Sequence, residues 1–241
     1  INCVMDQTDP HVARTTALNL EYEAFFRGTK MIRENRVKYQ CNIPWLILFD
    51  PTSACNMHCV GCWAGEYGNK NNLSFEDMDK IVTQGKELGV YLYMLTGGEP
   101  LVRKNVAQLV AGLKATPGIR RVTLTTNAVL LAEQLPALLD AGLDSVNISL
   151  DTLRPEVFRQ ITARDDFAAV QAGLQAALES DLPVKLNCVP QAGVNEGELE
   201  ALAALAKDNA MQVRFIEMMP IGYGAAMPCI SGPELRARFA R

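Results

Sequence analysis

The stretch "WLILFDPTSACNMHCVGC" (45–62) joins a short apolar segment to three closely spaced cysteines. The apolar segment has the length of a buried strand and ends before a proline, which favours a strand over a helix. Catalytic groups of parallel α/β folds gather at the carboxyl ends of the strands. The position of the cysteines therefore predicts a functional site at the end of the first strand.

The rest of the chain alternates short apolar segments with amphipathic ones. This alternation predicts consecutive βαβ units and a parallel sheet, which fits either a partial barrel or an open doubly wound sheet. A further helix is expected over 11–40, with Gly28 as a stop signal, and Ser74 is expected to cap the helix that follows it. The expected strands are 45–50, 90–95, 121–126, 145–150, 183–189 and 212–218, and the expected helices after the first strand are 74–88, 105–115, 131–141, 166–180 and 196–208.

Composition narrows the class of protein. The chain has 241 residues, 49% of them hydrophobic, and a net charge of −4. One large α/β domain is expected at this length. The chain has no basic block of five or more residues, so a nucleic-acid partner is not expected. The longest apolar run, 44–49, is far too short to span a membrane. No secretory signal is visible. Seven cysteines, three of them clustered, fit a metal site in a reducing compartment better than disulfides, so a cytoplasmic location is expected.

Three cysteines in this spacing indicate a metal site with one open position. Thiolates are soft ligands that suit zinc or iron–sulfur clusters. A closed structural zinc site needs a fourth ligand, and His58 is directly adjacent to Cys59, so the two rarely reach one ion together. A [4Fe–4S] cluster held by three thiolates leaves one iron free for a small molecule. A non-catalytic zinc-binding interaction protein stays the alternative from another class.

The CxxxCxxC spacing after a first strand resembles that of the radical S-adenosylmethionine (radical SAM) superfamily. The resemblance implies a partial (β/α)6 TIM-like barrel over 45–241, preceded by an N-terminal helical extension over 1–44. It implies a [4Fe–4S] cluster on Cys55, Cys59 and Cys62, and S-adenosylmethionine on the open iron. Reductive cleavage of this cofactor then gives a 5′-deoxyadenosyl radical that abstracts hydrogen from a substrate. The electron would come from a partner such as flavodoxin or ferredoxin.

Motifs at other strand ends extend this resemblance. "TGGEP" (96–100) follows the second strand and resembles the superfamily's GGEP element, which contacts the methionine amino group of the cofactor. "TTN" (125–127) and "NISLD" (147–151) end the third and fourth strands, where polar residues can also be simple helix caps. The resemblance assigns cofactor contacts to Gly61, Gly97, Gly98, Glu99, Ser149 and Met219.

From about Val106 to Arg241 the sequence resembles the GTP 3′,8-cyclases of molybdenum cofactor biosynthesis. That resemblance places Thr125, Lys185 and Arg214 near GTP, and cationic side chains suit a triphosphate. Period-two spacing puts Asn187 on the same strand face as Lys185.

The first hundred residues resemble a different radical SAM branch, with a tryptophan after the third cysteine. Either the chain is a natural relative with another substrate, a peptide or other small molecule, or it joins two branches with a seam near 96–106. The sequence leaves these alternatives open.

Overall fold

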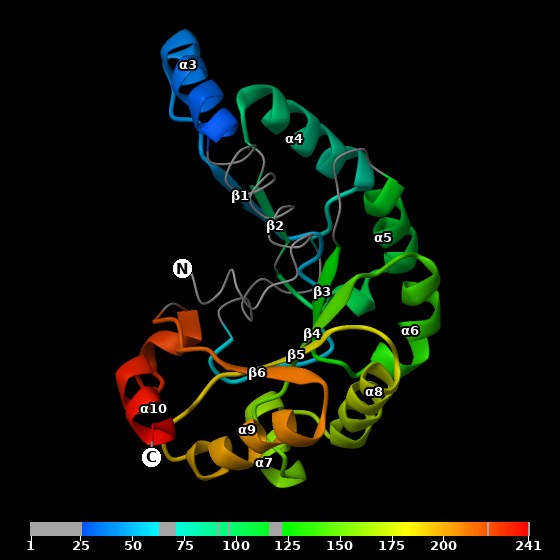
Figure 1. Cartoon of the computed structure of the whole chain (residues 1–241), viewed down its shortest axis with the longest axis vertical. Coiled ribbons are helices and arrows are strands. Elements are labelled where there is room, and N and C mark those ends of the chain that lie inside the picture. The colour runs from blue at the N-terminus through cyan, green and yellow to red at the C-terminus, as the bar shows by residue number, and fades with distance from the viewer. Residues whose placement is uncertain are drawn as a thin grey trace. The chain divides into compact units, whose positions relative to one another are not determined.

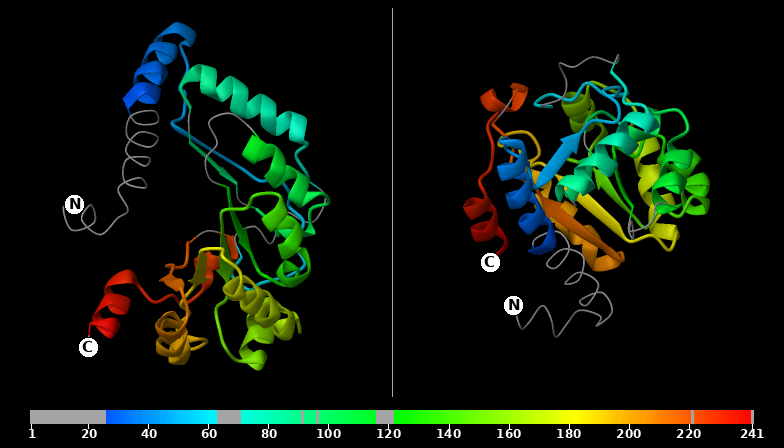
Figure 2. Two further views of the ribbon diagram at one scale, coloured as in Figure 1. Left: turned by 45° about the vertical axis from the view of Figure 1, so that its right-hand side comes forward. Right: turned by 90° about the horizontal axis from the view of Figure 1, so that it is seen from above.

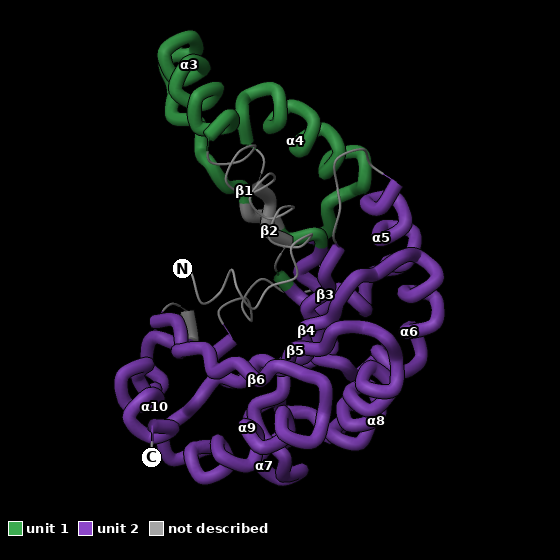
Figure 3. Tube along the Cα trace, in the orientation of Figure 1, with its two compact units in different colours: residues 1–51, 72–97 green, residues 52–71, 98–241 purple. Residues whose placement is uncertain are grey.

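The computed structural model describes residues 26–62, 71–90, 92–95, 97–115, 122–220 and 222–240. The chain divides into two compact units (Figure 3). Unit 1 comprises 1–51 and 72–97, and unit 2 comprises 52–71 and 98–241. Each unit is described by itself below. The predicted division into an extension over 1–44 and a barrel over 45–241 stays a prediction.

The described residues of unit 1 form two parallel strands and two helices (Figure 1). Its longer helix begins after Ser74, whose hydroxyl accepts a hydrogen bond of 3.0 Å from the Asp77 N–H, as the sequence predicts. The helix ends at Gly89, which has a left-handed φ of 97°. The elements are α3 (Thr29–Tyr39), β1 (Leu46–Phe49), α4 (Phe75–Leu88) and β2 (Leu92–Leu95).

Gly28 does not end a helix, so that prediction is wrong. Its backbone is helical, with φ −61° and ψ −45°, and α3 begins directly after it. A Cβ atom at Gly89 would lie 2.7 Å from the Gly28 carbonyl oxygen. This region is therefore a close contact between α3 and the end of α4 rather than a helix stop. The predicted helix before residue 26 lies outside the described residues.

In the described part of unit 2, four parallel strands form a sheet in the order β3-β4-β5-β6, which is also their order along the chain (Figures 1 and 2). Helices connect these strands, and α6 packs against α8. The elements are η2 (Pro100–Val102), α5 (Val106–Ala115), β3 (Thr123–Thr126), α6 (Leu131–Asp140), β4 (Ser145–Ser149), α7 (Pro155–Thr162), α8 (Phe167–Glu179), β5 (Val184–Cys188), η3 (Glu196–Glu198), α9 (Leu199–Asp208), β6 (Met211–Phe215), η4 (Gly222–Ala226) and α10 (Gly232–Phe239).

The two faces of the four-stranded sheet differ in polarity. Val146, Ile148 and Leu186 point to one face and are fully buried in the core. Residues between them point to the opposite face, because side chains alternate along a strand. Thr125 pairs with Asn147 on that opposite face. We call it the polar face, and it carries Thr125, Asn147, Ser149, Lys185, Asn187, Gln212 and Arg214.

Two features of unit 2 differ from the sequence prediction. Helix α7 is not predicted, because it has only eight residues; it begins with Pro155, which suits a first helical turn, and buries Val157, Phe158 and Ile161. Strand β6 ends at Phe215 rather than at residue 218. Its partner β5 ends at Cys188, two residues before Pro190, so β6 has no strand to pair with beyond this point.

The last helix is attached to the sheet and to its neighbour. The rings of Phe215 in β6 and Phe239 in α10 stack with centroids 5.1 Å apart. Arg238 donates hydrogen bonds to both carboxylate oxygens of Glu200 in α9. Ser231 and Glu234 form the capping box at the start of α10. None of the helices in the described ranges combines the length and the apolar character that a membrane span needs.

Candidate cluster and cofactor site

The three cysteines lie on a loop at the start of unit 2, and all three are partly buried. The end of α7 holds this loop by two backbone hydrogen bonds. The His58 N–H donates to the Thr162 carbonyl at 3.1 Å, and the Val60 N–H donates to the Ile161 carbonyl at 2.8 Å. A third bond of 3.2 Å, from the Cys62 N–H to the Cys59 carbonyl, closes a turn within the loop. The unpredicted helix α7 is therefore part of the site.

The environment of the thiols favours cation binding. Burial, together with the smaller effect of the charges of Cys62 and Asp151, raises the pKa of Cys59 to about 12. Burial also raises the pKa of Cys55, against a hydrogen bond of 3.4 Å from the Met57 N–H to its sulfur. A cation must therefore stabilise the thiolate forms at neutral pH. Three soft thiol donors, two of which have a raised pKa, fit an iron–sulfur cluster.

The spacing of the cysteines differs from that of a single-ion site. Within the ranges that the structure describes, no three His, Cys, Asp or Glu side chains are grouped as ligands of one metal ion. A [4Fe–4S] cluster takes each thiolate on a different iron, so its ligands need not converge on one ion.

Gly98 allows the GGEP segment to lie directly on the cysteine loop. Its N–H donates to the Thr52 carbonyl at 3.0 Å, and the Glu99 N–H donates to the Ala54 carbonyl at 2.8 Å. A Cβ atom at Gly98 would lie 2.1 Å from the Ala54 carbonyl oxygen. This close approach of two backbones explains the glycine independently of any ligand. Gly97, the last residue of unit 1, has a φ of 104°. The predicted cofactor contacts of Gly97 and Gly98 stay predictions.

Glu99 is buried and joins the GGEP segment to the end of β3. Its carboxylate accepts hydrogen bonds from the Leu101 N–H at 3.0 Å, the Thr126 hydroxyl at 2.6 Å and the Asn127 N–H at 2.7 Å. Burial raises the pKa of Glu99, and these hydrogen bonds lower it in part. The sequence predicts a cofactor contact for this carboxylate, and the structure gives it three internal partners. Glu99 therefore positions the segment, and its predicted cofactor contact stays a prediction.

Two asparagines connect the cysteine loop to the sheet. The side-chain N–H of Asn127, after β3, donates to the side-chain carbonyl of Asn56 at 2.7 Å. Asn56 lies directly after Cys55. The sequence marks the TTN segment as a strand end but does not identify this pairing, because only the fold brings residues 71 positions apart together.

The predicted substrate residues lie on the polar face. Asn147 in β4 accepts a hydrogen bond of 2.8 Å from the Arg214 guanidinium and donates one of 3.0 Å to the Thr125 hydroxyl. Lys185 is the strand partner of Asn147 on β5. The structure thus brings Thr125, Lys185 and Arg214 onto one face of one sheet. Asn147, which the sequence does not mark as a site residue, connects Thr125 to Arg214 by hydrogen bonds.

The predicted cofactor residues Gly61 and Ser149 also belong to unit 2. Ser149 is at the exposed end of β4 on the polar face. Gly61 has a φ of 83°, and a Cβ atom there would lie 3.3 Å from the terminal methyl carbon of Met218. Met219, the predicted contact, is half exposed. The structure thus places Met218 against the cysteine loop, and the cofactor contact of Met219 stays a prediction.

A second hydrogen-bond network holds the loops after β4 and β5 together. Asn195 is fully buried, and its side chain bonds to the Asp151 and Val189 carbonyls and to the Gln191 N–H at 2.7–3.0 Å. The Val189 N–H donates to the Asp151 carboxylate at 2.7 Å. Burial raises the pKa of Asp151 to about 6, against this hydrogen bond. In the sequence, Asn195 is only a polar residue in a loop. Its role in this network can be identified only from the folded structure.

Glu198 forms the other half of this network. Its carboxylate accepts hydrogen bonds from the Thr152 hydroxyl at 2.7 Å and the Leu153 N–H at 2.8 Å, and it pairs with the Arg154 guanidinium at 3.0 Å. Burial alone would raise the pKa of Glu198, but these donors outweigh it and lower the pKa. The loop after β4 is thereby fixed to the start of α9.

Comparison with curated proteins identifies similar chains. The chain is 43% identical over 176 residues to a GTP 3′,8-cyclase of Petrotoga mobilis, 45% over 179 residues to one of Heliobacterium modesticaldum and 41% over 197 residues to one of Moorella thermoacetica. These alignments cover 71–79% of this chain and 54–61% of the relatives, so the chain spans little more than half of their length. Each alignment is longer than the segment 106–241, so the similarity includes residues before Val106.

Solved structures with low sequence identity share the fold. SuiB of Streptococcus suis is 18% identical, with a TM-score of 0.60 over 89% of this chain and 50% of that one. A radical SAM methyltransferase of Sphaerobacter thermophilus is 18% identical, with a TM-score of 0.60 over 80% of this chain and 61% of that one. These likenesses confirm the predicted α/β partial-barrel fold.

A family model described as "Radical SAM superfamily" matches residues 49–206. The matched segment contains the three cysteines, the GGEP segment and strands β2 to β5. The chain therefore belongs to the radical SAM superfamily, whose members use a [4Fe–4S] cluster and S-adenosylmethionine, as the cysteine spacing predicts.

Proposed function

We propose that this chain is the cofactor-cleaving part of an enzyme that acts on a purine nucleoside triphosphate, with GTP 3′,8-cyclase chemistry in molybdenum cofactor biosynthesis. The observation that carries the proposal is the polar face, where Asn147 connects Thr125 to Arg214 beside the strand position of Lys185. The names of the similar curated proteins support the same substrate.

The residues of this chain have separable tasks in the proposed reaction. Cys55, Cys59 and Cys62 would hold the cluster, and α7 fixes their loop. When bound, the cluster and S-adenosylmethionine supply a one-electron cleavage and a carbon radical that abstracts hydrogen from the substrate. Lys185 and Arg214 would bind the triphosphate by charge-assisted hydrogen bonds. Because Asn147 orients the Arg214 guanidinium at 2.8 Å, this cation is held in place before the substrate arrives.

The electron donor and the compartment belong to this proposal. A low-potential carrier such as flavodoxin or ferredoxin would supply the electron. The cytoplasm is the proposed compartment, since it keeps thiols reduced and available to iron.

One experiment distinguishes the residues that hold the cluster from those that bind the substrate. Anaerobically reconstituted Cys59→Ala should lose the cluster and all 5′-deoxyadenosine formation, because two thiolates do not retain the cluster. Lys185→Ala should keep both the iron content and the electron paramagnetic resonance signal of the reduced cluster. Tight zinc binding by the wild-type chain with no reducible cluster would contradict the enzyme proposal. Loss of the cluster in Lys185→Ala would contradict the place of Lys185 on the substrate side.

A second experiment tests the substrate. Calorimetry with S-adenosylmethionine present should detect GTP binding to the wild-type chain, with affinity weakened roughly tenfold or more in Arg214→Ala, since a hydrogen bond to a charged group contributes about 1.5–3 kcal/mol. Arg159→Ala is the matched control, because this arginine belongs to α7 and not to the polar face, and it pairs with Asp165, which follows the helix. Absence of GTP affinity in the wild-type chain would exclude the cyclase substrate for this chain and favour another small molecule or a peptide.

A further inference from the structure

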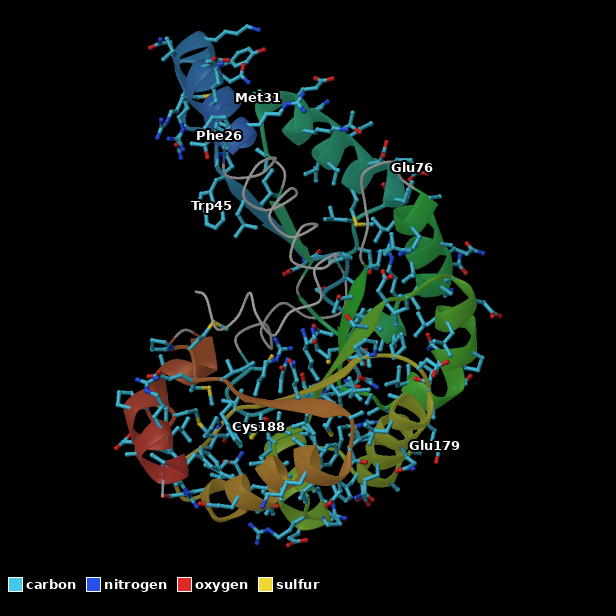
Figure 4. The ribbon with its side chains drawn as sticks, viewed as in Figure 1. Phe26, Met31, Trp45, Glu76, Glu179 and Cys188 are labelled. Carbon is cyan, nitrogen blue, oxygen red and sulfur yellow. The ribbon has the colours of Figure 1, made fainter. Side chains whose placement is uncertain are left out.

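The segment that follows GGEP forms one wall of an open groove at the surface of unit 2. The groove has a volume of about 590 Å³, and its walls come from residues 101–107 and from one face of α6. Helices α5 and α6 pack against each other, and their side chains lie along this side of the unit (Figure 4). The cluster and cofactor site does not use the side chains of this groove.

The described lining of the groove has more positive than negative charge, although the chain as a whole has a net charge of −4. Arg103 and Lys104 belong to the lining, and Lys104 is exposed. The first turn of α5 has no acidic residue to offset the partial positive charge of this helix end. Glu133 in α6 is the opposing anion, and Val102 adds an exposed apolar side chain. This combination suits a protein partner that presents carboxylates around an apolar patch.

Short backbone contacts connect the groove to the cysteine loop. The Glu99 N–H donates to the carbonyl of Ala54, which directly precedes Cys55, at 2.8 Å. From Glu99 the chain turns through η2, and the Val102 N–H donates to the Glu99 carbonyl at 3.1 Å. A 3₁₀ turn rises about 2 Å per residue, so Val102 lies roughly 6 Å along the chain from Glu99. The wall of the groove is therefore a surface of unit 2 only a few residues from the cysteine loop.

Hydrogen bonds fix this wall in place. The side chain of Gln134 in α6 donates to the Leu101 carbonyl at 2.9 Å, and the Glu99 carboxylate accepts from the Leu101 N–H at 3.0 Å. The Leu101 side chain is buried in the core. A partner that binds the groove therefore meets a preformed surface, which lowers the entropic cost of association.

We infer that this groove is the docking surface for the protein that delivers the electron to the cluster, an acidic, low-potential one-electron carrier. The inference rests on the proposed function, which requires such a carrier. One electron leaves the reduced carrier and lowers the charge of the cluster from [4Fe–4S]²⁺ to [4Fe–4S]⁺, so the carrier becomes oxidised by one electron. No bond forms or breaks between the two proteins.

The groove lies apart from the polar face. Leu101 and Val106 extend from its wall into the core, which also contains Val146 and Ile148 on the opposite face of the sheet from Asn147. The proposed nucleotide covers the polar face during the reaction. A carrier on the groove can therefore bind while the substrate is in place.

Charge variants of the groove test the docking surface. Reduction of the reconstituted cluster by reduced flavodoxin is followed by stopped-flow absorbance at low ionic strength. Lys104→Glu should slow this reaction roughly fivefold or more, because charges at the edge of an interface mainly affect the association rate. Glu133→Gln should accelerate it, since that change removes the opposing charge. Both differences should shrink at about 0.5 M salt, where exposed charges are screened.

Two controls separate docking from damage to the cluster. Lys207→Glu makes the same change in net charge, but Lys207 is in the last turn of α9, which leads into β6 at the other edge of the sheet from β3. This variant should keep the wild-type rate. Photoreduced 5-deazariboflavin, a small reductant that needs no docking surface, should reduce every variant as fast as wild type. Calorimetry with flavodoxin should show a weaker dissociation constant for Lys104→Glu and not for Lys207→Glu.

Three outcomes overturn the inference. In the first, Lys104→Glu and Lys207→Glu have equal rates with flavodoxin. In the second, Lys104→Glu also slows reduction by deazariboflavin, which would give Lys104 a structural role. In the third, deazariboflavin reduces the wild-type cluster, but neither flavodoxin nor ferredoxin does. A wild-type cluster that none of these reductants reduces would instead contradict the proposed function.

Discussion

Gly98 and Glu99 show how adjacent single residues hold the cysteine loop on the sheet. The absence of a side chain at Gly98 lets its backbone approach Ala54, and the buried carboxylate of Glu99 bonds to the end of β3. The sequence presents both residues as parts of a cofactor motif. Their internal contacts explain the motif equally well, since a displaced loop would misplace the three thiols.

Gly98→Ala should destabilise the chain by about 1–3 kcal/mol in urea unfolding and reduce cluster retention, because the new methyl group collides with backbone atoms that cannot rotate away. Gly197→Ala is the matched control, since a Cβ atom there meets nothing within 4 Å. A Gly98→Ala variant as stable as Gly197→Ala would show that the two backbones do not approach so closely.

At the level of elements, α7 and the loop that precedes it hold the cysteine loop in position, although they contain none of the predicted site residues. The carbonyls at the end of α7 hold the cysteine loop, and Glu198 holds the loop that leads into the helix. Both contacts cross between elements that are distant in sequence. The positions of the thiols therefore depend on how α7 is anchored.

Glu198→Gln should lower the free energy of unfolding at pH 7 by about 1–3 kcal/mol, because the buried carboxylate accepts charge-assisted hydrogen bonds. Its pKa is lowered in the folded chain from an ordinary value of 4.5, so the stabilisation is present above pH 4.5 and is lost as the pH falls through the folded-state pKa. Urea unfolding of wild type and variant between pH 7 and pH 3 should show the difference shrinking in acid.

Glu156→Gln provides the control for this change. The Glu156 carboxylate lies 3.8 Å from the guanidinium of Arg154, which also pairs with Glu198. The Glu156 side chain is 66% exposed, so its replacement should have little effect on the free energy of unfolding. A pH-independent difference between wild type and Glu198→Gln would contradict the role of the carboxylate charge.

For the whole molecule, the sequence predicts the order of strands and helices well. Strong apolar periodicity marks each strand of the sheet β3-β4-β5-β6, and glycine or serine marks the helix ends at Ser74 and Gly89. The incorrect predictions, at Gly28 and at the end of β6, lie where the local sequence signals are weaker. Gly28 has a helical backbone and lies against the end of a helix that is distant in sequence, and β6 stops where its partner strand stops.

The sequence by itself determines the chemistry, because three thiols in a CxxxCxxC spacing and their position after a strand are local properties of the chain. The alternation of strands and helices is also local, and it determines the parallel α/β fold. Only the tertiary structure decides which polar residues meet. The hydrogen bonds of Asn147 with Thr125 and Arg214, and that of Asn127 with Asn56, depend on strand register and on contacts across the unit. Such contacts join residues far apart in the chain, and no local pattern encodes them.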